Sequence, residues 1–307
     1  MTRYILRRLL QFIPVILIAT FIIYAMVFAI PGDPIRALGG DRPMSEAVQQ
    51  TLRDQYNLDD PLLIQYFKYM AGVAVGDFGT TFQGRPVTDI IVQRLPVTLY
   101  LAFVAVIIQI IIGVIAGTLA AIFRDRFIDR LVQVSSVLVV AVPILAIAFG
   151  LQFVFGLQLG WFPIAGIGSG FYSYILPGFV LASVSTALVA RLLRNSLVET
   201  LQSDYVRTAT AKGLKRSRVV GRHAMRNAMI PVVTFIGADL ATMLGGAILT
   251  EAIFNLPGIG QEVFRAIQAQ EGTVVVGIVT LLVLFFVVVN LIVDIAYAFL
   301  DPRIRYE

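Results

Sequence analysis

The sequence predicts an all-α membrane protein with six transmembrane helices and both termini in the cytoplasm. Three observations support this fold class. Of the 307 residues, 58% are hydrophobic and 14% are charged, and the mean hydropathy is +0.85, which excludes an ordinary soluble domain. Six apolar runs are each long enough to cross a hydrocarbon core of about 30 Å as a helix. Between the fourth and fifth runs lies a strongly basic stretch that must stay in water. The expected organisation is a first helix (1–30), an external loop (31–95) and a five-helix core (96–307).

The first membrane helix is predicted over residues 9–30. Arg3, Arg7 and Arg8 precede this apolar run of 22 residues. A cleaved signal peptide also starts with basic residues, but its apolar region is about 7–15 residues long and ends in a small-residue cleavage site. Because the run is longer and no A-x-A site closes it, we expect an uncleaved helix that starts in the cytoplasm.

Residues 31–95 are predicted to form a polar segment outside the membrane, and the turn sequence Pro31-Gly32-Asp33-Pro34 opens it. Two amphipathic helices are expected within it, and each is expected to pack on the protein or on the bilayer surface. The first, near 45–56, carries Val48, Leu52 and Tyr56 at four-residue spacing. The second runs from Pro61 to about Val75, with Asp60 as its N-cap and with Leu63, Tyr66, Phe67 and Met70 on one face.

The second span is predicted over about 96–122. Gly113 and Gly117 stand there at the G-x-x-x-G spacing that lets two membrane helices approach closely. A tight loop, Arg124–Arg130, then returns the chain to the membrane.

The third span is predicted over about 132–158, with an interruption at Pro143, because proline has no backbone N–H to donate within a helix. The fourth span is predicted over about 171–190. We expect it to end at Arg191 and Arg194, where the chain becomes charged.

Residues 204–231 hold seven of the chain's 24 basic residues and one acid, Asp204. A lysine or arginine costs about 2.5–3.5 kcal/mol at the centre of a bilayer, so this stretch cannot span. We expect two short helices joined at Gly213, where the missing Cβ permits a sharp turn, and a return to the membrane at Pro231. The basic residues are Arg207, Lys212, Lys215, Arg216, Arg218, Arg222 and Arg226.

The fifth span is predicted over about 229–250 and the sixth over about 274–299. Gly237, Ala241 and Gly245 give the fifth span a small face at four-residue spacing, against which another helix can pack tightly.

Polar residues in these two spans are candidates for a substrate path. Such groups by default face the protein interior or a wet cavity. Two interpretations stay open. Either these residues line the path, or they form hydrogen bonds between helices or pack against a partner subunit. Glu251, near the outer end of the fifth span, could contact substrate or face water. The candidates are Asp239, Glu251, Asn290 and Asp294.

The distribution of charge supports the predicted orientation. With both termini inside, 17 of the 24 Lys and Arg residues lie in the cytoplasm and 7 lie outside. Six of these seven fall in the long loop, to which the positive-inside rule gives little weight. The opposite orientation would place the most basic loop outside.

Three segments together resemble a known family. They are GDFGTTFQGRPVTDIIVQRLP (76–96), the basic stretch DYVRTATAKGLKRSRVVGRHAMRNAMIP (204–231) and TEAIFNLPGIG (250–260). The chain resembles ABC importer permeases of the oligopeptide, dipeptide and nickel family along essentially its whole length. The basic stretch is similar to their cytoplasmic coupling loop, E-A-A-x-x-x-G. Ala209 and Gly213 match its third and last positions, whereas Arg207 and Thr208 stand in place of Glu and Ala.

The resemblance implies the type I ABC importer permease fold in a bacterial cytoplasmic membrane. It implies a second homologous permease as a heterodimer partner, two cytoplasmic ATPase subunits that carry ATP and Mg²⁺, and an extracytoplasmic solute-binding protein that the external loop helps to contact. No cofactor is expected on this chain itself. Similar permeases handle dipeptides, longer peptides, glutathione-like compounds, nickel chelates and haem, so a short peptide is the expected substrate class and its identity stays open.

The coupling loop is expected to dock on the ATPase, because small residues let another protein approach the backbone and the flanking basic residues complement an acidic rim. The alternative is a basic helix that binds anionic lipid at the membrane surface. The expected ATPase-coupling residues are Asp204, Tyr205, Arg207, Thr208, Ala209, Ala211, Lys212, Gly213 and Leu214.

Other functions find little support in the residues. The chain has no G-x-x-x-x-G-K-[ST], G-x-S-x-G or H-E-x-x-H motif, and its single histidine, His223, and lack of cysteine argue against a zinc site. The net charge of +5 reflects cytoplasmic loops, so a nucleic-acid partner is not expected. A stand-alone secondary transporter or channel stays as the alternative, but it would need paired carboxylates, broken half-helices or inverted repeats. A structural membrane anchor would not need small helix faces or polar groups at depth.

Overall fold

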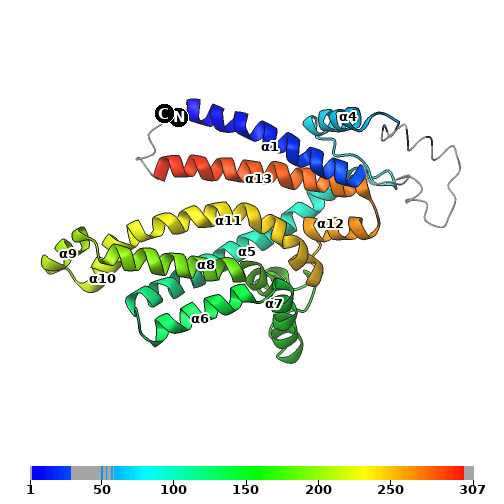
Figure 1. Ribbon diagram of the computed structural model, residues 1–307. Helices are drawn as coiled ribbons and strands as arrows, with labels where there is room; N and C mark the ends of the chain where they lie inside the picture. The colour runs from blue at the N-terminus through cyan, green and yellow to red at the C-terminus, as the bar shows by residue number, and fades with distance from the viewer. Residues whose placement is uncertain (1, 29–49, 51–52, 54–56, 58, 301–307) are drawn as a thin grey trace. The chain divides into compact units, whose positions relative to one another are not determined.

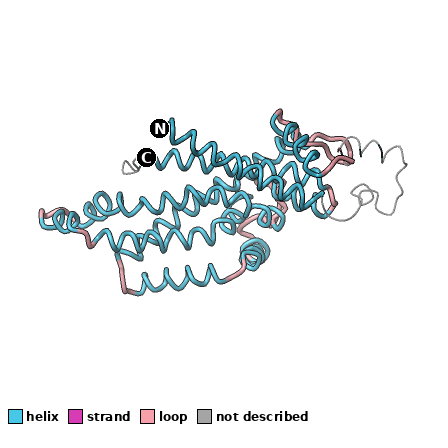
Figure 2. The backbone as a smooth tube through the Cα atoms, turned by 45° about the horizontal axis from the view of Figure 1, so that its top comes forward, coloured by secondary structure: helices cyan, strands magenta, loops and turns pink. Residues whose placement is uncertain are grey.

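The computed structural model describes residues 2–28, 50, 53, 57 and 59–300. Within these residues the elements are helical, apart from an isolated β-bridge between Thr80 and Pro86 (Figures 1 and 2). Five of the described helices are long and apolar enough to cross a membrane, and there are six spans if a bent helix pair is counted as one. The all-α membrane fold with six spans is therefore confirmed, while the cytoplasmic position of the termini stays a prediction. The amphipathic helix predicted near 45–56 lies almost entirely outside the described residues.

The chain packs into two compact units, one formed by Met1–Thr98 and Pro257–Glu307 and the other by Leu99–Leu256. The long helix α5 (Val87–Ile122) contributes its first turns to one unit and the rest to the other. The sequence-based division at residues 30 and 95 follows the expected membrane crossings, whereas packing joins the first and last helices.

In the first unit, α1 (Thr2–Phe28) and α13 (Gly272–Leu300) lie side by side and antiparallel (Figures 1 and 2). Their contact is close, because a Cβ added at Gly272 would lie 2.5 Å from Val27 Cγ1. Near the other end of the pair, Arg8 Nε lies 3.3 Å from Asp294 Oδ2. The described ends of the chain therefore lie at the same end of this unit, as an even number of spans requires.

The amphipathic helix predicted from Pro61 to Val75 is present as α4 (Leu62–Ala74), but two details of the prediction were wrong. Pro61 is the N-cap residue, and no side chain caps the helix; the Asp60 carboxylate instead accepts a hydrogen bond of 2.5 Å from Lys68. Tyr66 is buried against α1, where its hydroxyl donates to the Leu17 carbonyl at 2.9 Å. Leu63 and Phe67 are exposed, because they lie about 100° further round the helix than the residues that face α1.

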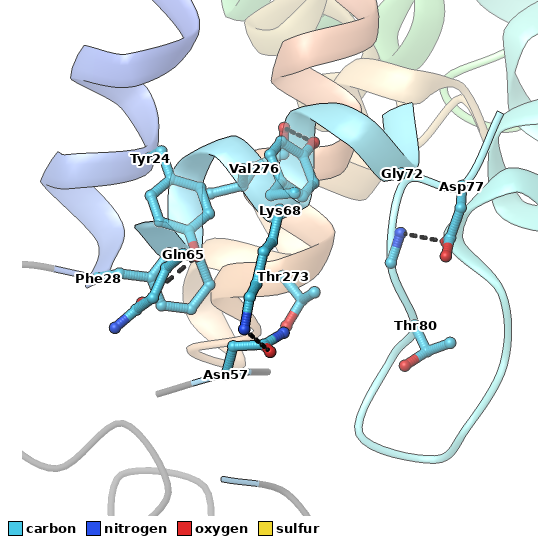
Figure 3. A pocket seen from close by; sticks show the side chains of 12 residues that line it. Tyr24, Phe28, Asn57, Gln65, Lys68, Gly72, Asp77, Thr80, Thr273 and Val276 are labelled. Carbon is cyan, nitrogen blue, oxygen red and sulfur yellow. Dashed lines mark hydrogen bonds between the residues drawn. The ribbon is translucent and has the colours of Figure 1, made fainter. Parts of the chain in front are cut away.

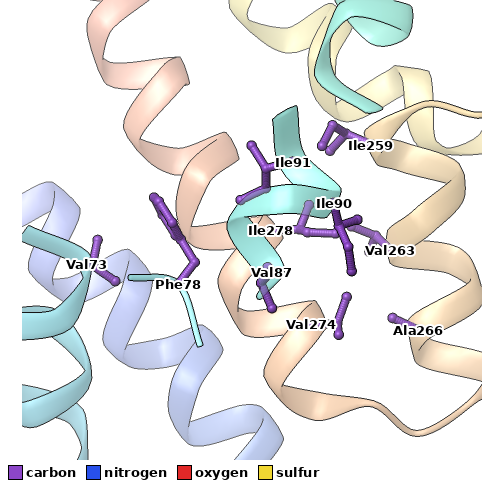
Figure 4. Packing of buried hydrophobic residues seen from close by; sticks show 10 residues of the cluster. All are labelled: Val73, Phe78, Val87, Ile90, Ile91, Ile259, Val263, Ala266, Val274 and Ile278. Atoms are coloured by element: carbon purple, nitrogen blue, oxygen red, sulfur yellow. The ribbon is translucent and has the colours of Figure 1, made fainter. Parts of the chain in front are cut away.

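The core of the first unit explains why α5 begins at Val87, nine residues before the predicted start of the second span. Val87, Ile90 and Ile91 pack with α12 (Ile259–Gln268) and α13 (Figure 4). Pro96 lies inside the helix, where one missing N–H is tolerated in a membrane segment. The buried residues of this core are Val73, Phe78, Val87, Ile90, Ile91, Ile259, Val263, Ala266, Val274 and Ile278.

In the second unit, the C-terminal part of α5 packs on α8 (Ile175–Leu201). A Cβ added at Gly113 would lie 2.6 Å from Val189 Cγ1, and one at Gly117 would lie 2.7 Å from the Ala190 carbonyl oxygen. Such distances leave no room for a side chain. The prediction that the G-x-x-x-G pair allows close helix approach is confirmed.

The predicted interruption of the third span at Pro143 is also confirmed. The chain bends by 105° between α6 (Phe127–Ala141) and α7 (Ile144–Leu151), which continues as a π-helical segment, η1 (Gln152–Gln158). The single-turn helix η2 (Gly170–Tyr174) then leads into α8. Two predicted boundaries were wrong, because α6 starts within the predicted loop and α8 continues past Arg191 and Arg194 to Leu201.

Candidate coupling site and membrane-depth polar residues

A short helix, α9 (Asp204–Ala211), joins the end of α8 to the start of the next long helix (Figure 1). Gln202 and Ser203 make the turn between α8 and α9, and Ser203 is the N-cap residue with an extended backbone. The short helix expected before Gly213 is therefore present, at the end of the second unit where α8 and α11 (Met225–Ile253) meet.

Gly213 ends α9 in a Schellman motif. Its φ of +78° lies in the left-handed region that favours glycine. The Gly213 N–H donates to the Thr210 carbonyl at 2.9 Å, and the Leu214 N–H donates to the Ala209 carbonyl at 3.4 Å, which is the hydrogen-bond pair that defines this motif. The turn predicted at Gly213 thus has a specific backbone cause.

The second of the two predicted short helices, after Gly213, is not a separate helix. After Lys215 the chain runs without a break through α10 (Arg216–Arg218), the π-helical η3 (Val219–Ala224) and α11. Pro231 lies inside α11 and does not start it. The helix continues through the basic residues because its inner side is apolar, with Val219, Ala224 and Ala228 buried.

The inner side of α9 is fixed by an apolar cluster. Val206 and Ala209 are 4% and 6% exposed, and they pack with Leu193 and Leu197 of α8. Burying a side chain such as Val206 stabilises by about 1.5–3 kcal/mol. Leu214 is partly buried against the same cluster. Ala209 therefore packs α9 onto its own chain, and its contribution to docking on an ATPase stays a prediction.

The outer side of α9 is polar and accessible. Tyr205 is 43% exposed, and its hydroxyl accepts a hydrogen bond of 2.8 Å from Asn227, which joins α9 to α11. Arg207 lies 3.9 Å from Asp204, and both side chains are largely exposed. The exposed members of the predicted coupling set are Asp204, Tyr205, Arg207, Thr208, Ala211, Lys212 and Gly213.

At membrane depth, Asp239 joins α11 to α5. Gln109 Nε2 donates to Asp239 Oδ2 at 3.0 Å, and Thr242 Oγ1 donates to Asp239 Oδ1 at 3.0 Å. Gln109 is fully buried. Of the two roles left open for Asp239, lining a path or bonding between helices, this contact is an example of the second.

The other candidate path residues have different surroundings. Asp294 pairs with Arg8 of α1, and Asn290 donates to the Phe286 carbonyl of its own helix at 2.8 Å. Both belong to the first unit, whereas Asp239 and Glu251 belong to the second. Glu251 is fully buried in α11, so the interpretation that it simply faces water was wrong.

One buried ion pair was missed by the sequence analysis. Asp129, predicted to lie in a loop, is 1% exposed in the first turn of α6 and pairs with Arg194 of α8. No spacing or motif links residues 65 positions apart, so no signal in a single sequence could have found the pair.

The first unit contains a cavity of about 200 Å³ between α1, α4, α13 and the segment 77–80 (Figure 3). Its charged residues already have partners within the chain. Lys68 Nζ donates to Asn57 Oδ1 at 2.9 Å, and Asp77 Oδ1 accepts the Gly79 N–H at 2.9 Å. Burial raises the pKa of the Tyr69 hydroxyl, which lines the same cavity. Among the described residues, no group of three His, Cys, Asp or Glu side chains could hold a metal ion.

Comparison with known families matches nearly the whole chain. A model described as "Binding-protein-dependent transport system inner membrane component" matches residues 109–306. A model described as "Binding-prot-dependent transport system membrane comp, N-term" matches residues 1–102.

Full-length relatives and a solved fold agree with these matches. The Glutathione transport system permease proteins GsiC of Salmonella paratyphi A (strain ATCC 9150 / SARB42) and Escherichia coli (strain K12) are each 38% identical over 308 residues, which cover 100% of both chains. A structure of the MetNI methionine ABC transporter in an inward-facing conformation aligns with a TM-score of 0.57 and 17% identity, over 69% of this chain and 96% of that one. The structural likeness shows the fold, which is that of a type I ABC importer permease.

Proposed function

The chain belongs to the family of binding-protein-dependent transport system inner membrane components, so it is a multi-pass permease subunit of an ABC importer, and from this premise we propose that it imports short peptides. The relatives that share 38% of its residues are permeases for glutathione, which is itself a short peptide. Glutathione and similar peptides are therefore the first substrates to test.

The proposed mechanism is alternating access driven from outside the chain. An extracytoplasmic binding protein delivers the peptide to a path between this subunit and a second, related permease. Two cytoplasmic ATPase subunits bind and hydrolyse ATP with Mg²⁺, and their movement reaches this chain through residues 204–231. In this scheme the chain receives force and lines the path, and it performs no chemistry of its own.

The proposal rests on how α9 packs, because one side of this helix is buried and the other is exposed. Its inner side is anchored by Val206 and Ala209, whereas its outer side presents polar and small side chains to the surroundings. A helix that is fixed on one side and accessible on the other can pass a push from a partner to α8 and α11. The lipid alternative explains the basic residues but gives no reason for a separate, anchored helix of eight residues ahead of them.

Substitutions on the accessible side of α9 test this assignment. Thr208→Glu and Ala211→Glu add a charged side chain where the ATPase would dock, and Ala211→Ser is the matched control. We expect membrane insertion at the wild-type level for all three. The two glutamate variants are expected to lose co-purification of the ATPase and peptide uptake. Ala209→Asp is unsuitable, because it would place a carboxylate inside the apolar cluster and disturb folding as well as docking.

Two results would contradict the proposal. The first is unchanged ATPase association in both glutamate variants. The second is ATP-independent transport by the purified chain in liposomes, which would favour a secondary transporter. The substrate class is tested separately, by identifying the ligand held by the cognate binding protein and by competing its uptake with glutathione and with dipeptides.

A further inference from the structure

Asp129 accepts hydrogen bonds from three parts of the second unit. Arg194 binds it with two atoms, since Nε donates to Oδ1 at 3.1 Å and Nη2 donates to Oδ2 at 2.7 Å. The N–H of Asp125, in the turn before α6, donates to Oδ2 at 2.9 Å, and Gln133 Nε2 donates to Oδ1 at 2.8 Å. A buried carboxylate with this many donors is held in one position, because losing any of them leaves charge unsatisfied.

α6 packs along α8, but most of its side chains are exposed. Only Asp129 and Ser136 of its 15 residues are buried. Leu131, Val134 and Leu138 are 54–59% exposed. Within this packing, the ion pair is a buried charged contact that holds the first turn of α6 against α8.

Arg194 lies on the same stretch of α8 that carries α9. The neighbouring Leu193, and Leu197 one turn later, belong to the cluster that anchors Val206 and Ala209. One short piece of helix therefore holds α9 on one side and α6 on the other.

We propose that Asp129 is a positioning residue for coupling, which through Arg194 makes α6 follow α8 and α9 as one body when the ATPases move. The proposal rests on the proposed function of α9. Its consequence inside the membrane is specific, because α6 and the bent α7 form one wall of an apolar cavity of about 410 Å³ and α5 and α8 form the other. Leu138, Val142 and Leu151 lie on the first wall, and Ile112 and Phe179 lie on the second. Movement of α6 with α8 preserves this cavity, whereas independent movement would collapse or open it.

The chain contains no cysteine, so spin labels can be attached to introduced cysteines without first removing native ones. Val134→Cys on α6 and Glu199→Cys on α8 provide two exposed positions for labels. Distances are measured by pulsed electron paramagnetic resonance in the complete complex, both without nucleotide and with ATP trapped. We expect one narrow distance that is the same in both states.

Asp129→Asn and Arg194→Gln should broaden the distance distribution or make it depend on nucleotide. Both variants should keep ATPase association, while the amount of peptide imported per ATP hydrolysed should fall about tenfold, within the typical range of coupling effects. Arg194→Lys keeps the charge without the two-atom contact and should be intermediate. Asp125→Asn is the matched control, because it removes a carboxylate that is 80% exposed four residues away.

Three results would overturn the proposal. The first is a narrow, unchanged distance together with unchanged import per ATP in Asp129→Asn and Arg194→Gln. The second is a broadened distance with normal import per ATP, which would show that α6 need not follow α8. The third is a loss of uptake that is fully explained by a smaller amount of assembled complex, which would show that the ion pair has only a structural role. Failure of the docking proposal is separable. It would appear as unchanged ATPase association in Thr208→Glu and Ala211→Glu, while the distance between the two labels still reports on the ion pair.

Discussion

The contact of α5 with α8 at Gly117 provides a sharp test of the packing. An alanine Cβ there would lie 2.7 Å from the Ala190 carbonyl oxygen, 2.9 Å from Leu193 Cβ and 3.2 Å from Ala190 Cα. Two of these atoms are backbone, so no side-chain rotation can relieve the overlap. To reach the 3.4 Å at which ordinary contact begins, the helices would have to separate locally by about 0.7 Å.

The expected cost of Gly117→Ala is about 1–3 kcal/mol, the usual range for overpacking a well-packed interior. Alanine also favours a helix over glycine by about 1 kcal/mol, which partly hides this cost. Gly150→Ala on α7 is the matched control, because the added Cβ would have no described atom within 4 Å apart from those of its chain neighbours and the adjacent backbone of its own helix. The helix preference is common to both variants, so the difference between their free energies of unfolding isolates the overpacking term of about 1–3 kcal/mol.

The assay is thermal unfolding of the purified complex in detergent, followed by size-exclusion chromatography, with uptake measured in parallel. We expect Gly117→Ala to unfold at a lower temperature than the wild type and Gly150→Ala to unfold at the same or a higher temperature. Equal unfolding temperatures for the two variants would show that α5 and α8 do not approach as closely as described.

Two further predictions concern the candidate coupling loop and the start of α13. Gly213→Ala should weaken ATPase association and lower the unfolding temperature, because a left-handed φ costs an ordinary residue about 1–2 kcal/mol. Asparagine tolerates this φ better, so Gly213→Asn should have smaller effects. Equal effects of the two variants would refute this explanation. Burial, with a smaller effect of Glu262, raises the pKa of the Glu271 carboxyl, so its folded-state pKa lies above the unfolded value. Stability should therefore fall as the pH rises from the unfolded pKa through the folded one, and Glu271→Gln should remove this fall in pH-dependent thermal unfolding.

The sequence predicted the membrane spans well and their ends poorly, and both outcomes have physical causes. Long apolar runs identify a span because each needs about 20 residues to cross the bilayer. Charged residues and prolines are weaker signals for an end. Arg194 continues α8 because Asp129 neutralises it, and Pro96 and Pro231 remain inside helices that tertiary packing holds together.

For the candidate coupling site, the sequence predicted the segment of the chain but not which of its residues are exposed. The turn at Gly213 follows from glycine chemistry and could be read directly from the sequence. Which small residue faces outward could not be read, because Ala209 and Ala211 differ only in their direction around a two-turn helix. That direction is set by Leu193 and Leu197, which come from another helix. The Asp129–Arg194 ion pair could not be predicted for the same reason, because it depends on how α6 packs against α8.

The surroundings of the two membrane aspartates limit what they can do in transport. A carboxylate at membrane depth is costly unless a neighbour satisfies it. Asp239 is satisfied by Gln109 from α5, and Asp294 by Arg8 from α1, each within its own unit. A carboxylate that is held by another helix can offer a passing peptide little without first releasing that helix. We therefore expect both aspartates to act between helices, and we propose that the substrate is selected by other surfaces of the path and by a binding protein.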